Sequence, residues 1–542
     1  MHRTDIAQAG RLTGDSLCTK TQRRARWGRI AIVGAVLGST LACGQPAAVE
    51  LAAGRSESAL SANCHDKDLL SLSATEALGA LESGEITSAQ YVDALLRRVE
   101  QHPEVNAFIH LDPDQARAAA AAADAARASG DPVGPLHGLP IVLKDNINTA
   151  DMPTTGGTPA LSGNQTAANA PVAQALIDAG AIIMGKTNMH ELAFGITSNN
   201  AAYGPVRNPY DLDRMPGGSS GGNGAALAAR MIPAAVGTDT GGSTRIPAAL
   251  TGTVGFRPTS GRYSGEGIVP ISATRDTAGP MARTVADVAL LDAVIADEPT
   301  ELDEVSLEGL RIGVPRAHFY ENLDPAVAKA MRKVLHRLER KGVVLVEADV
   351  PDVTALDNAA GFPIAIYEVV RDLTAYLADY APSVSFADVA YMSASPDVSG
   401  LLQSLADGTG TVPEFVYQDA MQIYRPALQA SYANYFAGHD VAAILYPTTP
   451  RAASLVGEDV TMDLNGEQVS TFLTFIRNTD PESVAGIPAL TFPAGMTPDG
   501  LPIGAEIAGP AGSDRALLAI GAAIEEALRD IRPPKLRPQP RH

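Results

Sequence analysis

Three short segments of the sequence carry side chains that could break an acyl bond. Lys144 ends the apolar run 140–144. Burial there would disfavour its ammonium form and lower its pKa from about 10.4, so that the neutral amine could act as a base. The second segment is the glycine-rich run Pro-Gly-Gly-Ser-Ser-Gly-Gly-Asn-Gly at 216–224. The third is Thr-Gly-Gly-Ser at 240–243, in which the Ser243 hydroxyl could attack a substrate. Together the three segments indicate a reaction centre more specifically than any one of them does.

Each segment also has an ordinary structural interpretation. A lysine next to Asp145 is often a salt-bridged strand end, and a glycine run is often a tight turn. The run 216–224 leads into a helical stretch, but it lacks the Lys-Ser/Thr of a P-loop and the strand-turn setting of a dinucleotide fingerprint. The segment 240–243 follows an apolar strand, where successive backbone N–H groups can face one point and form an oxyanion hole.

The elements that must position these residues alternate between short apolar runs and helical stretches. Strands are predicted at 140–144, 181–186, 231–239, 311–315, 343–347, 441–447 and 488–493. Helices are predicted at 116–130, 171–180 and 225–230, and after the capping-box pairs Ser73…Glu76 and Thr87…Gln90. Buried strands alternating with helices predict an α/β fold with a large mixed, mostly parallel central sheet covered by helices on both faces.

The sequence predicts one main domain at 67–530, because no long linker divides this part of the chain. Residues 356–435 are mostly helical in pattern and interrupt the series of strands, so we interpret them as a helical insertion that could roof a cleft. Residues 45–66 are small and polar and are expected to form a linker. Residues 531–542, rich in proline and arginine, are expected to be a disordered tail.

The first 44 residues have the pattern of a secretory signal. A basic stretch at 23–29 precedes about 14 apolar and small residues at 30–43, too few to span a membrane as a helix. The end of this stretch partly resembles a lipoprotein box, so membrane attachment through a lipid on Cys43 and ordinary cleavage are both open. A buried N-terminal helix is the alternative. We expect an exported protein that is periplasmic, anchored to a membrane as a lipoprotein, or secreted.

Composition excludes several classes of function. The chain has 542 residues, 45% of them hydrophobic, which is enough for a large core, and a net charge of -20. So acidic a chain is a poor nucleic-acid binder, because such binding needs a cationic face. The three cysteines, Cys18, Cys43 and Cys64, cannot form a disulfide framework in the body of the protein. The ten histidines include no zinc-protease motif, so no metal site is expected.

The three segments, taken with others, resemble the amidase signature family. The resemblance is carried by 138–147, 186–195, 216–226, 237–259 and 486–504, and it extends over roughly 70–510. The stretch 186–212 looks most like the branch of mandelamide and indoleacetamide hydrolases. The resemblance implies the amidase signature fold, no cofactor, and hydrolysis of a carboxamide C–N bond through a seryl acyl-enzyme.

Carried over by motif position, the resemblance implies a Ser-cisSer-Lys triad. Ser243 is then the nucleophile, Ser219 the bridging serine behind a cis Gly218–Ser219 peptide, and Lys144 the base that receives the proton. The oxyanion would be bound by the backbone N–H groups of Thr240, Gly241, Gly242 and Ser243. Supporting roles are implied for Ser220 next to Lys144 and for Asp239 in ordering the loop, while Arg245 is expected to tie Asp239 or a nearby carbonyl.

Two other functions remain open from the sequence. The first is the glutaminase-like subunit of a tRNA-dependent amidotransferase, and the second is an exported binding lipoprotein without catalysis. A small-molecule amide is the expected partner, and the triad does not select among aryl, peptide C-terminal and N-acyl amides. The pocket could be lined by aromatic residues that could equally pack in the core, namely Phe194, Tyr203, Phe362, Tyr367, Tyr417 and Tyr424. The sequence does not indicate an oligomeric state.

Overall fold

The computed structural model describes residues 69–528, and its main compact unit begins at Leu72. The expected signal segment 1–44 with Cys43, the linker 45–66 and the tail 531–542 lie outside the described residues. The unit from Leu72 onward holds all three segments of chemical interest.

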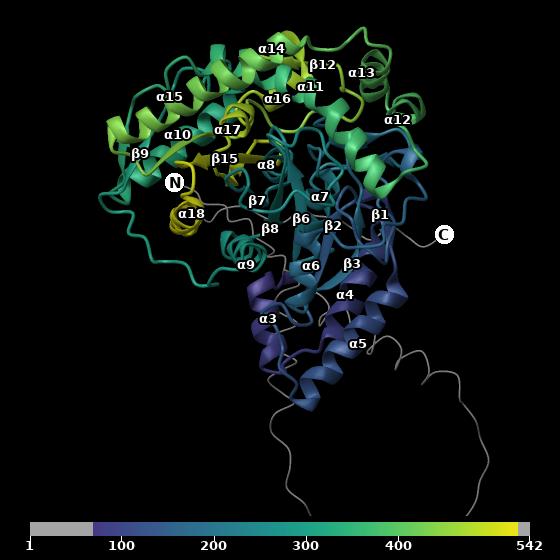
Figure 1. Cartoon of the computed structure of the whole chain (residues 1–542). Coiled ribbons are helices and arrows are strands. Elements are labelled where there is room, and N and C mark those ends of the chain that lie inside the picture. The colour runs from purple at the N-terminus through teal and green to yellow at the C-terminus, as the bar shows by residue number, and fades with distance from the viewer. Residues whose placement is uncertain (1–68, 529–542) are drawn as a thin grey trace, which may run out of the picture. The chain divides into compact units, whose positions relative to one another are not determined.

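One large sheet runs through this unit (Figure 1). It has 11 strands, which in spatial order are β1 (Phe108–Leu111), β3 (Ile182–Thr187), β2 (Pro140–Lys144), β6 (Ala234–Asp239), β8 (Thr277–Ala282), β7 (Val254–Arg257), β14 (Ala489–Met496), β15 (Pro502–Ala508), β11 (Ala443–Pro447), β9 (Arg311–Gly313) and β10 (Val344–Val346). Two small hairpins stand apart from it, β4–β5 (Asn199–Asn200 and Gly204–Pro205) and β12–β13 (Thr461–Leu464 and Glu467–Ser470).

The sheet is mixed, as expected, but it is not mostly parallel. Only the neighbours β2–β3, β2–β6, β9–β11 and β9–β10 run parallel. The other six neighbouring pairs are antiparallel. The strands that the sequence pattern missed explain the error. β7, β8 and β15 contain Gly or Pro, β1 is only four residues long, and each of them pairs antiparallel with a neighbour.

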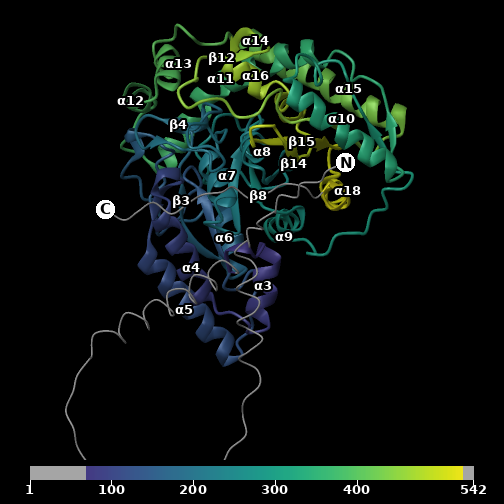
Figure 2. The ribbon, with the colours of Figure 1, turned by 180° about the vertical axis from the view of Figure 1, so that it is seen from behind.

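Helices accompany the sheet from end to end of the described chain (Figures 1 and 2). Those in the first half are α3 (Ala74–Glu82), α4 (Ser88–Gln101), α5 (Pro113–Ser129), α6 (Pro171–Asp178), α7 (Gly221–Ala228), α8 (Arg245–Thr251) and α9 (Val285–Ala296). Those in the second half are α10 (Pro325–Arg340), α11 (Val353–Tyr380), α12 (Phe386–Met392), α13 (Pro396–Ala406), α14 (Glu414–Asp419), α15 (Arg425–His439), α16 (Thr471–Ile476), α17 (Asp480–Ala485) and α18 (Asp514–Leu528).

The two faces of the sheet bury different cores. Along β11, Ala443 and Leu445 pack into one cluster with α9, α10 and α18, whereas Ile444 and Tyr446 pack into another with α11 and α15. This alternation follows from the two-residue repeat of a strand, which turns successive side chains to opposite faces. Helices therefore cover both faces, as the α/β pattern predicted. Helix α8 packs against β7, β14 and β15, and its first residue, Arg245, pairs with Asp239 at the end of β6.

Local sequence patterns correctly predicted the positions of several elements. Ser73 and Thr87 both form the predicted capping boxes, which satisfy otherwise unpaired N–H groups at the starts of α3 and α4. The strand predicted at 140–144 is β2, which ends at Lys144, and the strand predicted at 231–239 is β6, which ends at Asp239. Because β2 and β6 are parallel neighbours, Lys144 and Asp239 both end their strands at one edge of the sheet.

The stretch expected to be a helical insertion contains the helices from α11 to α15. A π-helical turn at Ala420–Tyr424 joins α14 to α15. In Figures 1 and 2, α11, α13, α14 and α15 lie at the top of the view, and α3, α4 and α5 lie at the bottom. Within residues 69–528, no helix is both long and apolar enough to cross a membrane.

Candidate active site

Lys144 is fully buried and has no carboxylate partner within 4 Å in the described part of the chain. Its Nζ donates to Ser219 Oγ and to Thr238 Oγ1, each at 2.7 Å. Burial lowers the pKa of this amine to about 7, although the negative charges of Asp239 and Asp276 partly oppose the shift. The interpretation of Lys144 as one half of a salt bridge with Asp145 is wrong, because Asp145 pairs with Lys186, 3.7 Å away.

The glycine-rich run places Ser219 between Lys144 and the loop that carries Ser243. The Gly218–Ser219 peptide is cis. The next residue, Ser220, donates its backbone N–H to the carbonyl of Ser243 at 3.1 Å, which holds the two segments side by side. Ser219 is buried and Ser243 is 7% exposed. Across residues 69–528, no hydrogen bond joins the hydroxyls of Ser219 and Ser243, so the structure brings the three residues together without a closed chain of hydrogen bonds.

The glycines of this run allow close packing. α7 begins at Gly221, inside the run, and not at 225 as the sequence predicted. A Cβ on Gly221 would lie 2.3 Å from Ser198 Oγ, and one on Gly222 would lie 2.2 Å from the carbonyl oxygen of Asn188. Close packing against Ser198 and Asn188 therefore overrides the weak helix propensity of glycine.

The Asp239 carboxylate organises the loop that leads from β6 to α8. It accepts hydrogen bonds from the backbone N–H groups of Gly242 (2.9 Å) and Thr244 (3.1 Å), as expected for a residue that orders this loop. The expectation that Gly242 belongs to an oxyanion hole is not met, because its N–H is already donated to Asp239. The N–H groups of Thr240, Gly241 and Ser243 have no protein partner among the described residues.

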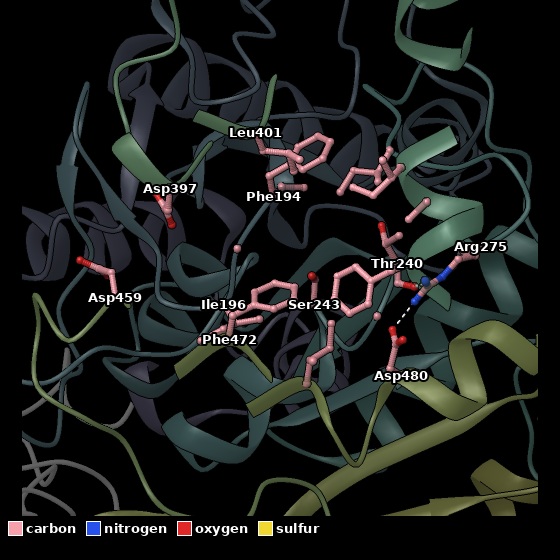
Figure 3. A pocket seen from close by; sticks show the side chains of 18 residues that line it. Phe194, Ile196, Thr240, Ser243, Arg275, Asp397, Leu401, Asp459, Phe472 and Asp480 are labelled. Carbon is pink, nitrogen blue, oxygen red and sulfur yellow. Dashed lines mark hydrogen bonds and ion pairs between the residues drawn. The ribbon is translucent and has the colours of Figure 1, made fainter. Parts of the chain in front are cut away.

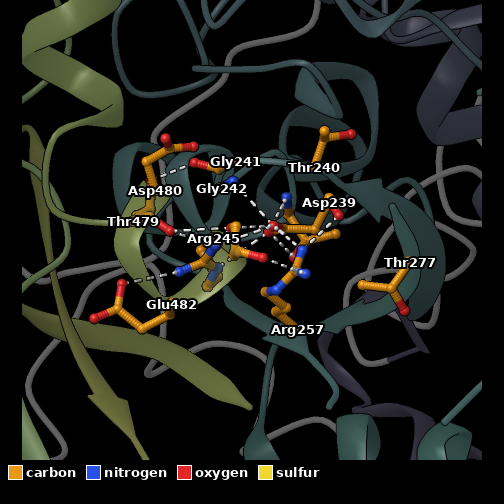
Figure 4. Close-up of polar contacts among 12 residues, drawn as sticks. Asp239, Thr240, Gly241, Gly242, Arg245, Arg257, Thr277, Thr479, Asp480 and Glu482 are labelled. Carbon is orange, nitrogen blue, oxygen red and sulfur yellow. Dashed lines mark hydrogen bonds and ion pairs between the residues drawn. The ribbon is translucent and has the colours of Figure 1, made fainter. Parts of the chain in front are cut away.

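Two buried arginines compensate the charge of Asp239 (Figure 4). Arg245 donates to both carboxylate oxygens, at 3.0 and 3.1 Å, and Arg257 donates at 3.0 Å. Burial alone would raise the pKa of Asp239, but the charges and hydrogen bonds of the arginines hold it well below its usual value. Arg245 also donates to Glu506 at 2.6 Å, so the expected tie to Asp239 is confirmed and extends to β15.

A cavity of about 300 Å³ opens in front of Ser243 (Figure 3). Its walls are largely apolar and aromatic, with Phe194, Ile196, Ile271, Phe362, Phe472 and Ile476 among the lining residues. Polar groups lie at its edges, where Asp397 and Asp459 are on one side of Ser243 and Arg275, paired with Asp480, is on the other. Such a cavity suits a small ligand with an apolar body and one reactive polar group.

Sequence reasoning missed several residues of this site and misplaced one. Thr238, not Ser220, is the second partner of Lys144. Ser220 Oγ donates instead to the carbonyl of Thr238 at 3.3 Å. Of the six aromatic residues considered, only Phe194 and Phe362 line the cavity. Phe472, Arg275 and Asp480 had no local signal, since long-range packing alone brings them to the cavity. In the part of the chain that the structure describes, no three His, Cys, Asp or Glu side chains are arranged to hold a metal ion.

Comparison with known proteins identifies the family. A family profile described as Amidase matches residues 90–518. The chain belongs to the amidase family.

This amidase is similar over most of its length to two amide hydrolases and to a solved peptide amidase. It is 46% identical over 456 residues to an indoleacetamide hydrolase of Agrobacterium vitis, which covers 84% of this chain and 97% of that protein. It is 42% identical over 481 residues to a mandelamide hydrolase of Pseudomonas putida, over 85% of this chain and 92% of that protein. The solved structure of the peptide amidase from Stenotrophomonas maltophilia matches it with a TM-score of 0.74 and 31% identity, over 86% of this chain and 98% of that one. The protein is thus an amidase, an enzyme that hydrolyses amides, as the sequence predicted.

The variant Asp239→Asn of the amidase should be less stable by about 3–5 kcal/mol, because neutralising Asp239 leaves two buried arginines short of one carboxylate. The midpoint and slope of urea unfolding would measure this loss. Since the folded pKa of Asp239 lies well below its unfolded value of about 3.9, the charge stabilises fully above pH 4 and is lost only as the pH falls through the folded value. The difference between variant and wild type should therefore stay constant from pH 5 to 8.

Asp276→Asn is the matched control for this prediction. Asp276 contacts the same loop through Thr240 Oγ1 at 2.6 Å and also accepts two backbone hydrogen bonds, but it has no arginine partner within 4 Å in the described chain. Asparagine keeps one oxygen that can accept from the two backbone N–H groups, and its NH2 group can donate to Thr240 Oγ1, so we expect a total loss of only about 1 kcal/mol. Equal losses in the two variants would contradict charge compensation as the source of the effect.

Proposed function

We propose that the protein hydrolyses small primary amides with an aryl or arylalkyl acyl group, through an acyl-enzyme on Ser243. One observation carries this proposal. Ser243 lines an apolar cavity, and the segment beside it holds Ser219 2.7 Å from a buried lysine whose pKa is about 7. A lysine with that pKa is a neutral amine in much of the protein near neutral pH, which is the form a base requires.

The proposed proton path runs from Ser243 through Ser219 to Lys144. When the amine of Lys144 is neutral, its lone pair can accept the hydroxyl proton of Ser219 while it still donates to Thr238. Ser219 then takes the proton of Ser243 as the Ser243 oxygen attacks the amide carbonyl. This step requires the Ser243 hydroxyl to turn toward Ser219 when substrate binds, a change common among catalytic hydrogen bonds that are open without ligand.

The two half-reactions balance without a cofactor. The Ser243 oxygen bonds to the carbonyl carbon, the C–N bond breaks, and the proton stored at Lys144 returns through Ser219 to the leaving ammonia. Water then attacks the ester carbonyl and gives a proton to the same path. As the bond between the carbonyl carbon and the Ser243 oxygen breaks, that proton returns through Ser219 to the Ser243 oxygen, and the carboxylic acid is released. The negative oxygen formed in each half-reaction would be bound by the N–H groups of Thr240, Gly241 and Ser243.

The preference for an aromatic acyl group rests on the cavity walls and on the relatives. Phe194, Phe362 and Phe472 give the cavity flat apolar surfaces against which a ring can pack. The relatives with 46% and 42% identity are named for amides of aromatic acids. Both are hydrolases, which supports hydrolysis over the role of an amidotransferase subunit and over binding without turnover.

The pH dependence of kcat/KM tests the role of Lys144. In the wild type, kcat/KM should rise with pH through an apparent pKa of about 7, because only the neutral amine accepts a proton. Lys144→Ala should lower kcat/KM about 10²- to 10⁴-fold at pH 7 and less at pH 9–10, where hydroxide can replace the base. Lys186→Met is the control. Lys186 is also buried but does not contact Ser219. The kcat/KM of Lys186→Met, even if it is lower, should therefore still rise with pH through an apparent pKa of about 7. A loss in Lys144→Ala that is the same at all pH values would contradict the role of a base.

Ammonia release from a panel of amides tests the substrate class. We expect indole-3-acetamide, phenylacetamide or mandelamide to give a kcat/KM at least about tenfold above those of peptide C-terminal amides and N-aryl amides, because the small aromatic acyl groups of the first three fit the apolar cavity of about 300 Å³. The variant Ser243→Ala, which lacks the proposed nucleophile, measures the background release of ammonia. Preference for a peptide amide would contradict the proposed class, and turnover of a matching ester without any amide would contradict amide hydrolysis itself.

We also propose that residues 1–44 direct export of the enzyme, on the pattern of a basic stretch followed by apolar and small residues. Fractionation of cells and mass spectrometry of the mature N-terminus would test this. A lipid on Cys43 predicts wild-type enzyme in the membrane fraction and release of the Cys43→Ser variant, whereas ordinary cleavage predicts both in the soluble exported fraction. Full-length enzyme in the cytosol, with residues 1–44 intact, would contradict export.

A further inference from the structure

The loop 240–243 is fixed in place through its carbonyl groups. The carbonyl of Thr240 accepts from Arg275 Nε at 3.2 Å, and that of Gly241 accepts from Thr479 Oγ1 at 2.6 Å. The carbonyl of Gly242 accepts from the N–H of Ile246 at 2.7 Å. In a planar trans peptide, the C=O and the following N–H point in opposite directions. Holding each carbonyl therefore also sets the direction of the next N–H.

The peptide between Thr240 and Gly241 is the one that matters most for the proposed reaction. Its N–H belongs to Gly241, which lines the cavity and whose N–H has no partner in the described chain. Its carbonyl is held by Arg275, whose cationic group also polarises the peptide and makes the N–H a stronger donor. The next peptide cannot serve in the same way, because the N–H of Gly242 already donates to Asp239.

Arg275 is itself held rigidly by three segments of the chain. It is 3% exposed, and besides Thr240 it donates to the carbonyl of Gly361 in α11 at 2.7 Å and to the carboxylate of Asp480 at the start of α17. Figure 3 shows Arg275 and Asp480 paired beside Thr240. All of the nitrogens of the guanidinium are thus engaged, which leaves the group one orientation.

Glycines allow these segments to meet. A Cβ on Gly361 would lie 2.8 Å from Asp480 Oδ2, and one on Gly241 would lie 2.6 Å from Asp480 Oδ1. Both distances are shorter than a carbon–oxygen contact permits, so α11 and the loop reach Asp480 only because neither glycine carries a side chain. Phe362, the residue after Gly361, forms part of the cavity wall and is 41% exposed. The same guanidinium therefore joins the cavity wall to the loop.

We propose that Arg275 is a positioning residue for amide hydrolysis, which aims the N–H of Gly241 at the oxygen that becomes negative in the transition state. This role rests on the proposed function, since it requires an oxyanion formed at Ser243. Arg275 does not touch the reacting atoms in this arrangement. It acts through the Thr240–Gly241 peptide, and Asp480 neutralises its charge so that the cavity gains a directed donor without a net positive group.

The variant Arg275→Met tests the proposal through inhibitors of two kinds. An aryl trifluoromethyl ketone adds to Ser243 and forms an oxyanion, whereas an aryl alcohol of the same size fills the apolar cavity without one. Arg275→Met should weaken the ketone and lower kcat by the same factor, about 10- to 100-fold, which is somewhat less than removal of a whole oxyanion donor. Affinity for the alcohol and KM should change less than about threefold. Equal weakening of both inhibitors, or of neither, would overturn the proposal.

Two further variants separate positioning from general stability. Arg262→Met removes another arginine that bridges two carboxylates, Asp292 and Glu298, outside the cavity, and it should leave the ratio of the two inhibitor affinities unchanged. Arg275→Lys keeps the charge but loses the planar guanidinium, so it should shift the ratio of the two inhibitor affinities in the direction expected for Arg275→Met. It therefore provides the test if Arg275→Met does not fold. An unchanged ratio in Arg275→Lys, with a normal unfolding midpoint, would also overturn the proposal.

Labelling with a fluorophosphonate distinguishes failure of this inference from failure of the proposed function. Mass spectrometry should locate the label on Ser243 in the wild type and in Arg275→Met, with the same final stoichiometry but about 10- to 100-fold slower reaction in the variant. Equal labelling rates would overturn only the role of Arg275. No label on Ser243 in the wild type would overturn both the acyl-enzyme and the role assigned to Arg275.

Discussion

The Asp239 carboxylate and its two arginines are the interaction on which the rest of the site depends. A buried carboxylate is costly unless it is paired and fully hydrogen-bonded, and Asp239 meets both conditions through Arg245, Arg257 and the loop N–H groups. Each partner comes from a different element. Arg245 begins α8, Arg257 ends β7, and the N–H groups belong to the loop around Ser243. The position of Ser243 is thus a consequence of satisfying one charge.

The same compensation explains how a lysine can stay neutral close to an aspartate. Lys144 ends the strand next to the one that Asp239 ends, and an unpaired carboxylate there would favour the ammonium form. Because the arginines hold the charge of Asp239, its effect on Lys144 is smaller than that of burial, and the pKa of the amine falls to about 7. Arg245 and Arg257 pair with Asp239, and Lys144 is therefore left without a strong counterion. This division of charge separates the structural ion pairs from the base of the proposed reaction.

The sequence predicted what depends on local pattern. The apolar run that ends at Lys144, the strand that ends at Asp239 and the two capping boxes all need only a few neighbouring residues, and all were confirmed. β8 and β15 were missed because glycine and proline mask their strand pattern. As a result, the sheet was wrongly predicted to be mostly parallel. The contact of Ser220 with the backbone of Thr238, in place of Lys144, depends on rotamers that spacing does not fix. The cavity wall could not be predicted, since Phe194, Phe362 and Phe472 approach one another only in the folded chain.

The contacts of the loop 240–243 with α17 and β15 carry a consequence for the order of synthesis. Lys144, Ser219 and Ser243 all leave the ribosome in the first half of the chain, but Thr479, Asp480 and Glu506, which hold the loop and its arginines, come more than 200 residues later. A nascent chain that lacks these residues has every reactive side chain and the contacts of Asp239, but it lacks the later contacts that hold the Gly241 carbonyl, Arg245 and Arg275. Full hydrolytic activity should therefore appear only after the last strands have been synthesised.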